Sequence, residues 1–455
     1  MIKMSLSRLA SVLRGKCYGE DLFFCGVETD TRKCEYLSSE ALFVALKGNN
    51  FDGHDFLIGA HKQGIRSFLV SSLDSLPSGS SAVVVPDTNR ALLHMAAYWR
   101  QHFSIPLVCV AGSNGKTTVR SMISAIFTEF FGEDNYLATC GNFNNHIGIP
   151  KTLFNLNPRH RAAVIEFGMN HPGEMPTLLL AASPTVSVVT NTLHEHMEFM
   201  KSLDSIAREN GLAYEMLPEN GTCIINHDDD FYPLYVRQAG PRNQVWFGRK
   251  HNSHVSSTLI SRNSRCQTVD FFYHNRCYRV YLHLAGEHNI SNAMAAFSVG
   301  VALGVSGEVI ARALSKVYPV AGRLNFFSGI YGSELIDDTY NSNPDSTRAA
   351  IDVLMSSPRR RKLLVMGDMA EMGPFLQTFY RDIACYARSK GVSKLFLLGR
   401  SVHSMSDYFG DGATCCNTVE ALVSVIKDSI LDDAVILVKG SRFMGMERVM
   451  AELIC

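Results

Sequence analysis

Residues 112–118, G-S-N-G-K-T-T, constrain this chain most, because they join a short apolar run to a helix-forming run. The run from Ile105 to Ala111 is typical of a buried strand, and apolar residues recur at helical spacing after Lys116. A glycine turn between a strand and a helix N-terminus points backbone N–H groups and the positive end of the helix dipole at one place. The run therefore predicts a nucleoside triphosphate site of the P-loop type.

Two side chains of this loop have expected roles. Lys116 would reach the outer phosphates of the nucleotide, and the Thr117 hydroxyl would bind Mg²⁺. The usual pattern has a glycine five residues before Gly115, where this chain has Val110. A fortuitous match in an ordinary loop is the alternative, which the flanking strand and helix disfavour. The residues of this loop expected to bind the nucleotide are Gly112, Ser113, Asn114, Gly115, Lys116, Thr117 and Thr118.

Length and composition limit the class of protein. A chain of 455 residues predicts about three domains, which we place at 1–104, 105–320 and 321–455. Basic and acidic residues balance at 43 each, so no basic field would recruit nucleic acid. No apolar run is long enough for membrane insertion, and the N-terminus has an amphipathic helical pattern rather than that of a signal peptide. Twelve cysteines without a C-x-x-C pair indicate a reducing, cytoplasmic setting; we expect a monomer, although the sequence does not determine the oligomeric state.

The first block, residues 1–104, alternates short strand-like and helical runs, which predicts a small α/β domain. Two polar stretches stand out, at 28–33 and 45–56. Either stretch alone would be explained by turn-forming residues. Together they could bind a polar, phosphorylated ligand. The candidate binding residues in these stretches are Thr29, Asp30, Thr31, Arg32, Lys47, Gly48, Asp52 and His54.

The central block carries three further polar features. Asn142, Asn144 and Asn145 supply amide donors and acceptors in a loop that needs fewer of them. Glu166 ends a buried strand beside the phosphate loop, where a carboxylate would hold Mg²⁺. His196 is expected to complete this site; a surface histidine is the alternative, and zinc is disfavoured because further ligands are not evident.

The end of the central block predicts a β-hairpin over 268–284, turning near His274 and Asn275, and then an alanine-rich helix. Asn289 and Asn292 lie near the start of that helix. They either cap it or hydrogen-bond the edge of an adenine ring.

The third block contains strand runs at 362–367, 394–399 and 434–439, each followed by a helical stretch. This order predicts a Rossmann-like open parallel sheet with helices on both faces, and ligands at its carboxyl edge. Polar loops at 337–344, 367–373 and 438–442 would therefore face a cleft.

The motifs together resemble the Mur ligase family over essentially the whole chain. They include T-D-T-R, F-D-G-H-D-F, the shortened phosphate loop, G-N-F-N-N-H-I-G-I-P, D-D-T-Y-N-S-N-P, G-D-M-A-E-M-G and V-K-G-S-R, in the family's order. The resemblance implies a UDP-sugar-binding N-terminal domain, a central ATP-binding P-loop domain and a C-terminal Rossmann-like ligase domain. D-D-T-Y-N-S-N-P is closest to the branch that joins D-alanyl-D-alanine to UDP-MurNAc-tripeptide in peptidoglycan precursor synthesis.

The resemblance also implies roles for particular residues. ATP would phosphorylate the tripeptide carboxylate to an acyl phosphate, which the amine of D-Ala-D-Ala attacks. Lys116, Glu166 and His196 would be catalytic, and Thr117, Glu166 and His196 would place Mg²⁺. ATP would also contact Asn289, Asn292, Arg323, Asp338 and Asn341. Substrate would contact Asn142, Asn144, Asn145, Tyr340, Asn343, Lys439, Ser441 and Arg442.

One departure from the family pattern concerns the metal site. The family commonly has a lysine that CO₂ carbamylates to bind a second Mg²⁺, in the pattern A-K-G-E. Here Asn210 stands at the lysine and Leu212 at the glutamate; Ala321 also replaces a proline. Two alternatives to a working ligase of this branch stay open: a Mur-type ligase with another peptide or amino-acid substrate, and a non-catalytic nucleotide-binding protein.

Overall fold

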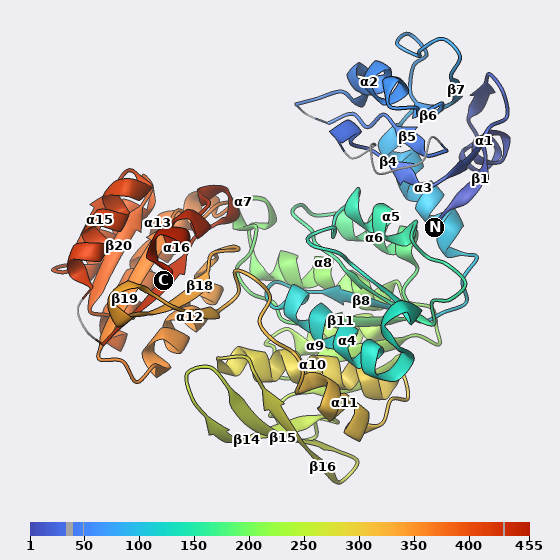
Figure 1. Cartoon of the computed structure of the whole chain (residues 1–455). Coiled ribbons are helices and arrows are strands. Elements are labelled where there is room, and N and C mark those ends of the chain that lie inside the picture. The colour runs from blue at the N-terminus through green and yellow to red at the C-terminus, as the bar shows by residue number, and fades with distance from the viewer. Residues whose placement is uncertain (33–39, 49, 431–432) are drawn as a thin grey trace.

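The computed structural model describes residues 1–32, 40–48, 50–430 and 433–455. It is an α/β protein in which the N-terminal part, the central part and the C-terminal part each carry their own main sheet (Figure 1). The α/β class predicted from the sequence is confirmed. Lys33 and Asn49, which belong to the two polar stretches of the first block, lie outside the described residues. No helix in the described ranges is long and apolar enough to cross a membrane.

The N-terminal part has a five-stranded sheet in the order β2-β7-β6-β5-β4, parallel except for β2. The expected helix at the N-terminus begins only at Leu6, because the preceding residues form a strand. Ile2 and Met4 alternate into the core in the manner of a strand, and β1 pairs with β3. The elements are β1 Lys3–Ser5, α1 Leu6–Leu13, β2 Lys16–Tyr18, β3 Phe23–Cys25, β4 Val27–Glu28, β5 Leu42–Val44, α2 Leu57–Lys62, β6 Ser67–Val70, β7 Ser81–Val84 and α3 Thr88–Arg100.

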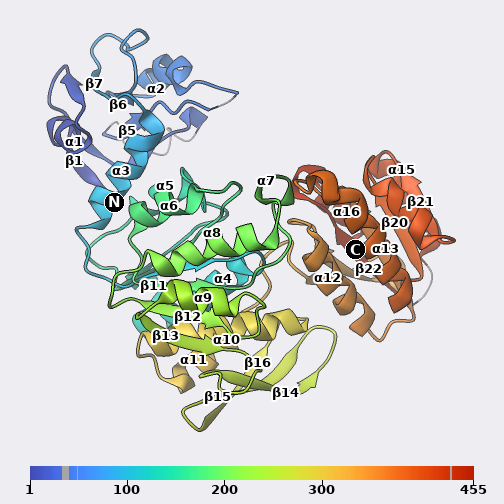
Figure 2. The ribbon, with the colours of Figure 1, turned by 180° about the vertical axis from the view of Figure 1, so that it is seen from behind.

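The central sheet has six parallel strands in the order β13-β12-β11-β8-β10-β9. Alternate residues of β8 face opposite cores, since Leu107 and Cys109 pack with α5, α6, α8 and α9, whereas Val108 and Val110 pack with α4 and α10. Helices α5, α6 and α8 lie on one side of this part of the molecule and α10 on the other (Figure 2). The elements are β8 Leu107–Ala111, α4 Lys116–Phe131, β9 Tyr136–Ala138, α5 Gly148–Leu153, β10 Ala162–Glu166, α6 Glu174–Ala182, β11 Val186–Val189, α7 Met197–Met200, α8 Leu203–Glu215, β12 Thr222–Asn226, α9 Tyr232–Ala239, β13 Asn243–Phe247 and α10 Glu287–Ala302.

A three-stranded antiparallel sheet, β14-β15-β16, follows the central sheet and packs its apolar residues with α10 and α11. The predicted hairpin is present. His274 and Asn275 form its two-residue turn with φ of 45° and 59°, as a type I′ turn requires. The elements are β14 Ser256–Arg262, β15 Gln267–Tyr273, β16 Arg276–Leu282 and α11 Gly307–Leu314.

The C-terminal sheet has the order β17-β18-β22-β19-β20-β21. It is parallel except at one edge, where β17 runs antiparallel to β18. The three predicted strands, now β19, β20 and β22, are parallel to one another as expected. β17, which the sequence pattern did not predict, is antiparallel because only residues 329–333 separate it from β18 and a parallel pair needs a long crossover. The elements are β17 Asn325–Ser328, β18 Glu334–Asp338, α12 Pro344–Ser356, β19 Arg361–Gly367, α13 Leu376–Lys390, β20 Lys394–Leu398, α14 Met405–Phe409, β21 Ala413–Cys416, α15 Val419–Ser429, β22 Ala434–Lys439 and α16 Glu447–Leu453.

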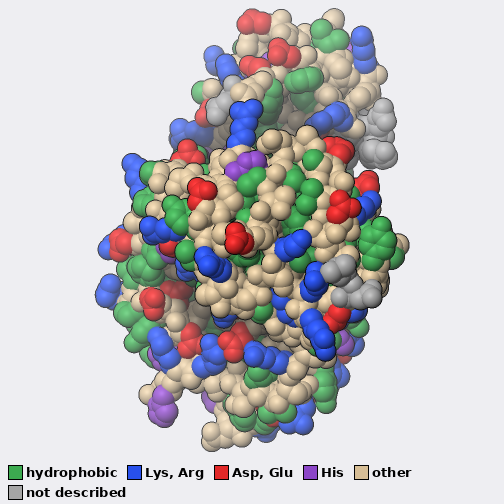
Figure 3. Space-filling model, turned by 90° about the vertical axis from the view of Figure 1, so that its left-hand side faces the viewer, with side chains coloured by type: hydrophobic (Ala, Val, Ile, Leu, Met, Phe, Trp, Pro, Cys, Tyr) green, Lys and Arg blue, Asp and Glu red, His purple; other side chains and the backbone are tan. Residues whose placement is uncertain are grey.

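Helices cover both faces of the C-terminal sheet, as predicted. Leu364 and Met366 of β19 pack with α12 and α13, whereas Leu363 and Val365 pack with α15 and α16. On the outer face of this part of the molecule, basic and acidic side chains are interspersed (Figure 3). None of the eleven cysteines in the described ranges forms a disulfide.

Candidate active site

A cavity of about 420 Å³ lies where the central and C-terminal parts meet. Parallel strands of both sheets bring their carboxyl ends to it, as expected for ligand sites of α/β sheets. The lining includes the phosphate loop after β8 and the residues that follow β10, β11 and β18. The predicted site residues that line it are Ser113, Asn114, Gly115, Lys116, Thr117, Thr118, Asn142, Asn144, Asn145, Glu166, His196, Asn289, Asn292, Arg323, Asp338, Tyr340, Asn341, Asn343 and Lys439.

The phosphate loop has the conformation that its two glycines permit. Gly112 and Gly115 have φ of 112° and 84°, in the region that favours glycine. A Cβ at Gly112 would lie 2.3 Å from Thr190 Oγ1, and one at Gly115 would lie 2.3 Å from Asn292 Oδ1. The N–H groups of Gly112, Ser113 and Asn114 are bonded to Asn210 and Asn191. The N-terminus of α4 lines the cavity, and the positive end of its helix dipole suits an anion.

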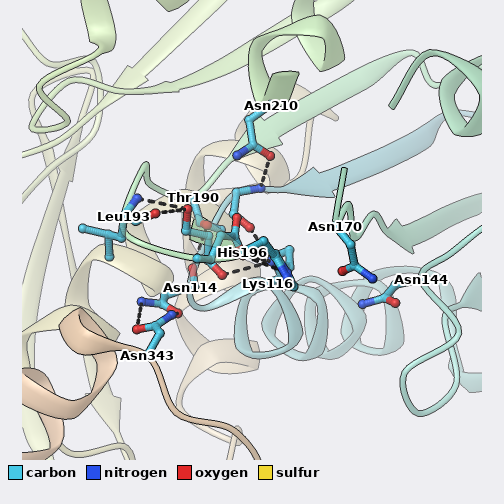
Figure 4. A network of polar contacts seen from close by, with 12 residues as sticks. Asn114, Lys116, Asn144, Asn170, Thr190, Leu193, His196, Asn210 and Asn343 are labelled. Atoms are coloured by element: carbon cyan, nitrogen blue, oxygen red, sulfur yellow. Dashed lines mark hydrogen bonds and ion pairs between the residues drawn. The ribbon is translucent and has the colours of Figure 1, made fainter. Parts of the chain in front are cut away.

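Lys116 points into this loop. Its Nζ donates to the Ser113 carbonyl at 3.0 Å and lies 3.2 Å from Glu195 Oε2 (Figure 4). The side chain is mostly buried, so its charge acts in a poorly solvated setting where it counts for more than in water. An ammonium held at the mouth of a P-loop can neutralise a phosphate.

Two carboxylates at the cavity have an oxygen that is buried and has no hydrogen-bond partner among the described residues. Glu166 Oε1 accepts from Asn144 Nδ2 at 3.0 Å, but its Oε2 accepts none and lies 3.7 Å from Arg120 Nε. Glu195 Oε1 is likewise buried and accepts no hydrogen bond from the described residues. Burying a carboxylate oxygen without a hydrogen-bond donor is costly, and Arg120 Nε lies too far from Glu166 Oε2 to donate one. The donor set therefore fits a hard divalent cation.

The structure tests how many protein ligands such a cation could have. Within the described ranges, no three histidine, cysteine, aspartate or glutamate side chains converge as a metal cluster. Mg²⁺ commonly takes only one or two carboxylates and completes its shell with water and phosphate oxygens. Glu166 and Thr117 both line the cavity, which is compatible with a Mg²⁺ that takes few protein ligands.

His196 stands between the two parts of the molecule. Its backbone is left-handed, with φ of 48°. Its Nδ1 makes a short hydrogen bond with Glu371 Oε2 from the loop after β19, and Nε2 lies 3.9 Å from Glu195 Oε2. The hydrogen bond from His196 lowers the pKa of the Glu371 carboxyl. The ring is thus oriented by one carboxylate and faces a second.

Three further contacts join the C-terminal part to the phosphate loop and its neighbours. Arg323 Nη2 donates to Thr117 Oγ1 at 3.0 Å. The amides of Asn114 and Asn343 exchange hydrogen bonds at 3.3 and 2.8 Å (Figure 4). His194 Nδ1 lies 2.8 Å from Asp345 Oδ2. Asn289 and Asn292, both buried, join through their own amides at 2.9 Å beside the loop.

Lys439 lines the cavity but is only 1% exposed. Its Nζ is bonded to Asp338 Oδ2 at 2.5 Å and to the Asn341 carbonyl at 2.9 Å. The Lys439 ammonium, predicted to contact substrate, is therefore engaged in this structure by an ion pair with the end of β18 and a hydrogen bond to the loop after it.

Several predicted site residues lie outside this cavity. Arg32, in the first domain, is exposed and paired with Asp30, while Asp52 holds His54 Nδ1 at 2.6 Å. Arg442 is exposed beside Glu447. The predicted residues that do not line the cavity are Gly112, Thr29, Asp30, Thr31, Arg32, Lys47, Gly48, Asp52, His54, Ser441 and Arg442.

Sequence reasoning missed several polar residues at the cavity, among them Glu195, Glu371 and Asp345. Glu371 and Asp345 lie in motifs that the sequence flagged, G-D-M-A-E-M-G and the residues just after D-D-T-Y-N-S-N-P. Glu195 directly precedes His196, which the sequence predicted as a metal ligand. These motifs were visible in the sequence, but no local pattern shows that Glu371 and Glu195 lie beside His196 and that Asp345 lies beside His194.

A P-loop sheet, a second open sheet that closes over its phosphate site, and buried carboxylates between them define the class of ATP-dependent ligases that form amides through activated carboxylates. Comparison with known proteins identifies the family. The chain matches the Mur ligase middle domain over residues 110–300, the Mur ligase glutamate ligase domain over 322–442 and the Mur ligase family catalytic domain over 25–100. The chain belongs to the Mur ligase family, as predicted.

Individual relatives match over nearly the whole length. The UDP-N-acetylmuramoyl-tripeptide–D-alanyl-D-alanine ligase of Escherichia coli is 36% identical, over 100% of this chain and 99% of that protein. The crystal structure of MurF from Acinetobacter baumannii has a TM-score of 0.92 at 29% identity, covering 99% of both chains. MurF of Thermotoga maritima, solved in complex with ADP, shares the fold with a TM-score of 0.80 at 22% identity, covering 94% of this chain and 96% of that one.

Proposed function

We propose that this protein uses ATP to join D-alanyl-D-alanine to UDP-MurNAc-tripeptide. The observation that carries the proposal is the 36% identity to the E. coli ligase of that specificity, which spans the entire chain. The cavity supports it, because the phosphate loop and the C-terminal loops each supply part of its lining. A cytoplasmic location and a monomeric state belong to this proposal.

The proposed reaction has two steps. An oxygen of the tripeptide carboxylate takes the γ-phosphoryl group of ATP, giving an acyl phosphate and ADP. The amine of D-alanyl-D-alanine then attacks the acyl carbon. The bond between the acyl carbon and the phosphate oxygen breaks, phosphate leaves with its electron pair, and the amine loses a proton as the amide forms. Both steps depend more on positioning and charge neutralisation than on covalent help from the protein.

The residues of the cavity have corresponding roles. Lys116 would neutralise the phosphate that is transferred. Arg323 is suited to a second phosphate contact, because its Nε is buried without an acceptor and its guanidinium stacks 4.4 Å from the Tyr340 ring. Thr117, Glu166 and His196 would hold Mg²⁺, which when bound supplies charge neutralisation to the phosphates. Asn289, Asn292, Asp338 and Asn341 would contact ATP from the other side.

The UDP-sugar would bind through the first domain and extend toward the cavity. Glu28 ends β4 directly before the T-D-T-R motif, and its Oε1 accepts from the Thr29 N–H at 2.7 Å. The same oxygen pairs with Lys151 of α5, which follows the asparagine loop. This buried ion pair links the proposed sugar-nucleotide loop to Asn142, Asn144 and Asn145, so one long substrate could contact both.

Phosphate release tests the proposal. Purified protein with ATP, Mg²⁺, D-alanyl-D-alanine and a UDP-MurNAc-tripeptide ending in either lysine or diaminopimelate should release phosphate and yield the pentapeptide by mass spectrometry. Omitting the dipeptide or the tripeptide should stop product formation. Turnover only with other amines or peptides would indicate a ligase of different specificity, and nucleotide binding without any turnover would indicate a non-catalytic protein.

A further inference from the structure

Glu195 lies in the cavity between a lysine and a histidine. It is 6% exposed, and its Oε2 is 3.2 Å from Lys116 Nζ and 3.9 Å from His196 Nε2. Its Oε1 is buried and accepts no hydrogen bond from the described residues. A nearly buried carboxylate with an oxygen left unpaired in a polar cavity is suited to a cation.

The neighbouring histidine is prepared for the same task. Glu371 holds His196 Nδ1, which favours the proton on that nitrogen and leaves the lone pair of Nε2 free. Histidines that bind metals usually have such a carboxylate on their other ring nitrogen. Nε2 is also the ring nitrogen that faces Glu195, so a cation placed between them could contact both Nε2 and the Glu195 carboxylate.

Asn210 cannot serve as the ligand that the family's carbamylated lysine provides. It is 1% exposed and does not line the cavity. Its Oδ1 accepts from the Gly112 N–H at 3.0 Å, so the side chain points at the end of β8 rather than at the phosphates (Figure 4). The negative charge that a carbamate would add is therefore missing at this position.

We propose that Glu195 and His196 Nε2 bind a second divalent cation, distinct from the Mg²⁺ that Thr117 and Glu166 would hold, and that Glu195 supplies the charge that Asn210 cannot. Glu371 is a positioning residue that fixes the His196 ring from the C-terminal part of the chain. The inference rests on the proposed function, because nucleotide phosphates would supply further ligands. Nucleotide binding would also draw Lys116 away from Glu195 toward the phosphates and free Oε2 for the cation.

Mn²⁺ binding tests this site without ligase substrates. The protein is saturated with a non-hydrolysable ATP analogue, and free Mn²⁺ is followed by electron paramagnetic resonance during titration. The unmodified protein should bind two Mn²⁺ ions. Glu195→Gln should weaken one of them at least about tenfold, while Glu198→Gln, an exposed carboxylate on α7 outside the cavity, should bind as the unmodified protein does.

Glu371→Gln separates positioning from simple structural damage. It should weaken the same Mn²⁺ ion about 10–100-fold, whereas affinity for the analogue measured in EDTA should stay unchanged and report an intact fold. Two Mn²⁺ ions bound with unaltered affinity by Glu195→Gln, or a single ion in the unmodified protein, would overturn the proposal. The titration contains no tripeptide or dipeptide, so neither result bears on the proposed ligase activity, which the phosphate-release assay tests separately.

Discussion

Arg323 donates a hydrogen bond from Nη2 to Thr117 Oγ1 at 3.0 Å, across the junction of the C-terminal part and the phosphate loop. The same guanidinium stacks on Tyr340, and its Nε is buried without an acceptor. A planar cation with an unused donor beside a phosphate loop is suited to a phosphate oxygen. The pair therefore ties the C-terminal part to the position where the ATP phosphates are proposed to bind.

Arg323→Ala should raise the Michaelis constant for ATP about 10–100-fold, since hydrogen bonds to charged groups contribute about 1.5–3 kcal/mol. Arg323→Lys should restore little of the lost ATP affinity, because an ammonium can neither stack flat on the Tyr340 ring nor donate two parallel hydrogen bonds as a guanidinium does. Steady-state kinetics with varied ATP checks both variants. Arg312→Ala, on the surface of α11, is the control. An unchanged Michaelis constant for ATP in Arg323→Ala would contradict the proposed contact between Arg323 and the ATP phosphates.

Lys116→Ala should reduce acyl phosphate formation about a thousandfold or more, because a preorganised charge in a poorly solvated site contributes several kcal/mol to the transition state. Trapping the acyl phosphate with hydroxylamine measures this step directly. Lys62→Ala, an exposed lysine of α2, should leave the rate unchanged. Normal trapping in Lys116→Ala would mean that the loop does not bind the transferred phosphate.

Turnover should not depend on dissolved CO₂, because Asn210 has no amine to carbamylate and its amide is engaged by Gly112. Rates in CO₂-free and bicarbonate-supplemented buffer should therefore agree. Asn210→Ala should instead weaken ATP binding about 5–100-fold, since it leaves the Gly112 N–H buried and unpaired at a cost of about 1–3 kcal/mol. Arg208→Ala, an exposed neighbour on α8, should show neither effect. Slower turnover of the unmodified protein without CO₂ would point to another carbamylated lysine.

Arg32→Ala should raise the Michaelis constant for the UDP substrate and leave that for ATP nearly unchanged. The reason is position, since Arg32 is exposed in the first domain and does not line the cavity where ATP is proposed to bind. Measurements with each substrate varied in turn distinguish the two constants, with Arg90→Ala on α3 as the control. Equal effects on both constants would indicate general loss of structure rather than loss of a ligand contact.

Tyr214→Phe should destabilise the central part by about 1–3 kcal/mol, because two buried backbone groups lose their partner. The Tyr214 hydroxyl donates to the Ile224 carbonyl at 2.6 Å and accepts from the Val189 N–H at 3.0 Å, which fastens α8 to the central sheet. Urea midpoints by pulse proteolysis measure the change. Tyr408→Phe, at an exposed hydroxyl, should have no such effect, and equal midpoints for Tyr214→Phe and the unmodified protein would contradict the prediction.

The sequence by itself was enough for the features that depend on a few neighbouring residues. The apolar run, two glycines and amphipathic stretch around Lys116 predicted β8, the phosphate loop and α4, because each depends on local backbone preferences and on one buried face. The hairpin turn at His274 and Asn275 was predictable for the same reason. The order of the motifs was sufficient to identify the family.

Local patterns failed where a partner in space decides the outcome. Lys3–Ser5 became a strand because β3 lies beside it. The sequence pattern did not reveal β17, which runs antiparallel because its link to β18 is too short for a crossover. Burial against a neighbour, rather than intrinsic propensity, determines such short elements.

Only the tertiary structure brought together the groups that give the cavity its chemistry. His196 and Glu371 lie 175 positions apart in sequence yet share a hydrogen bond. The structure also shows that Glu195 has a buried oxygen without a hydrogen-bond donor, and that Asn210 accepts a hydrogen bond from the Gly112 N–H. These facts depend on how two sheets pack against each other. No window of sequence encodes that packing, because burial and charge at a site are properties of all the surfaces that enclose it.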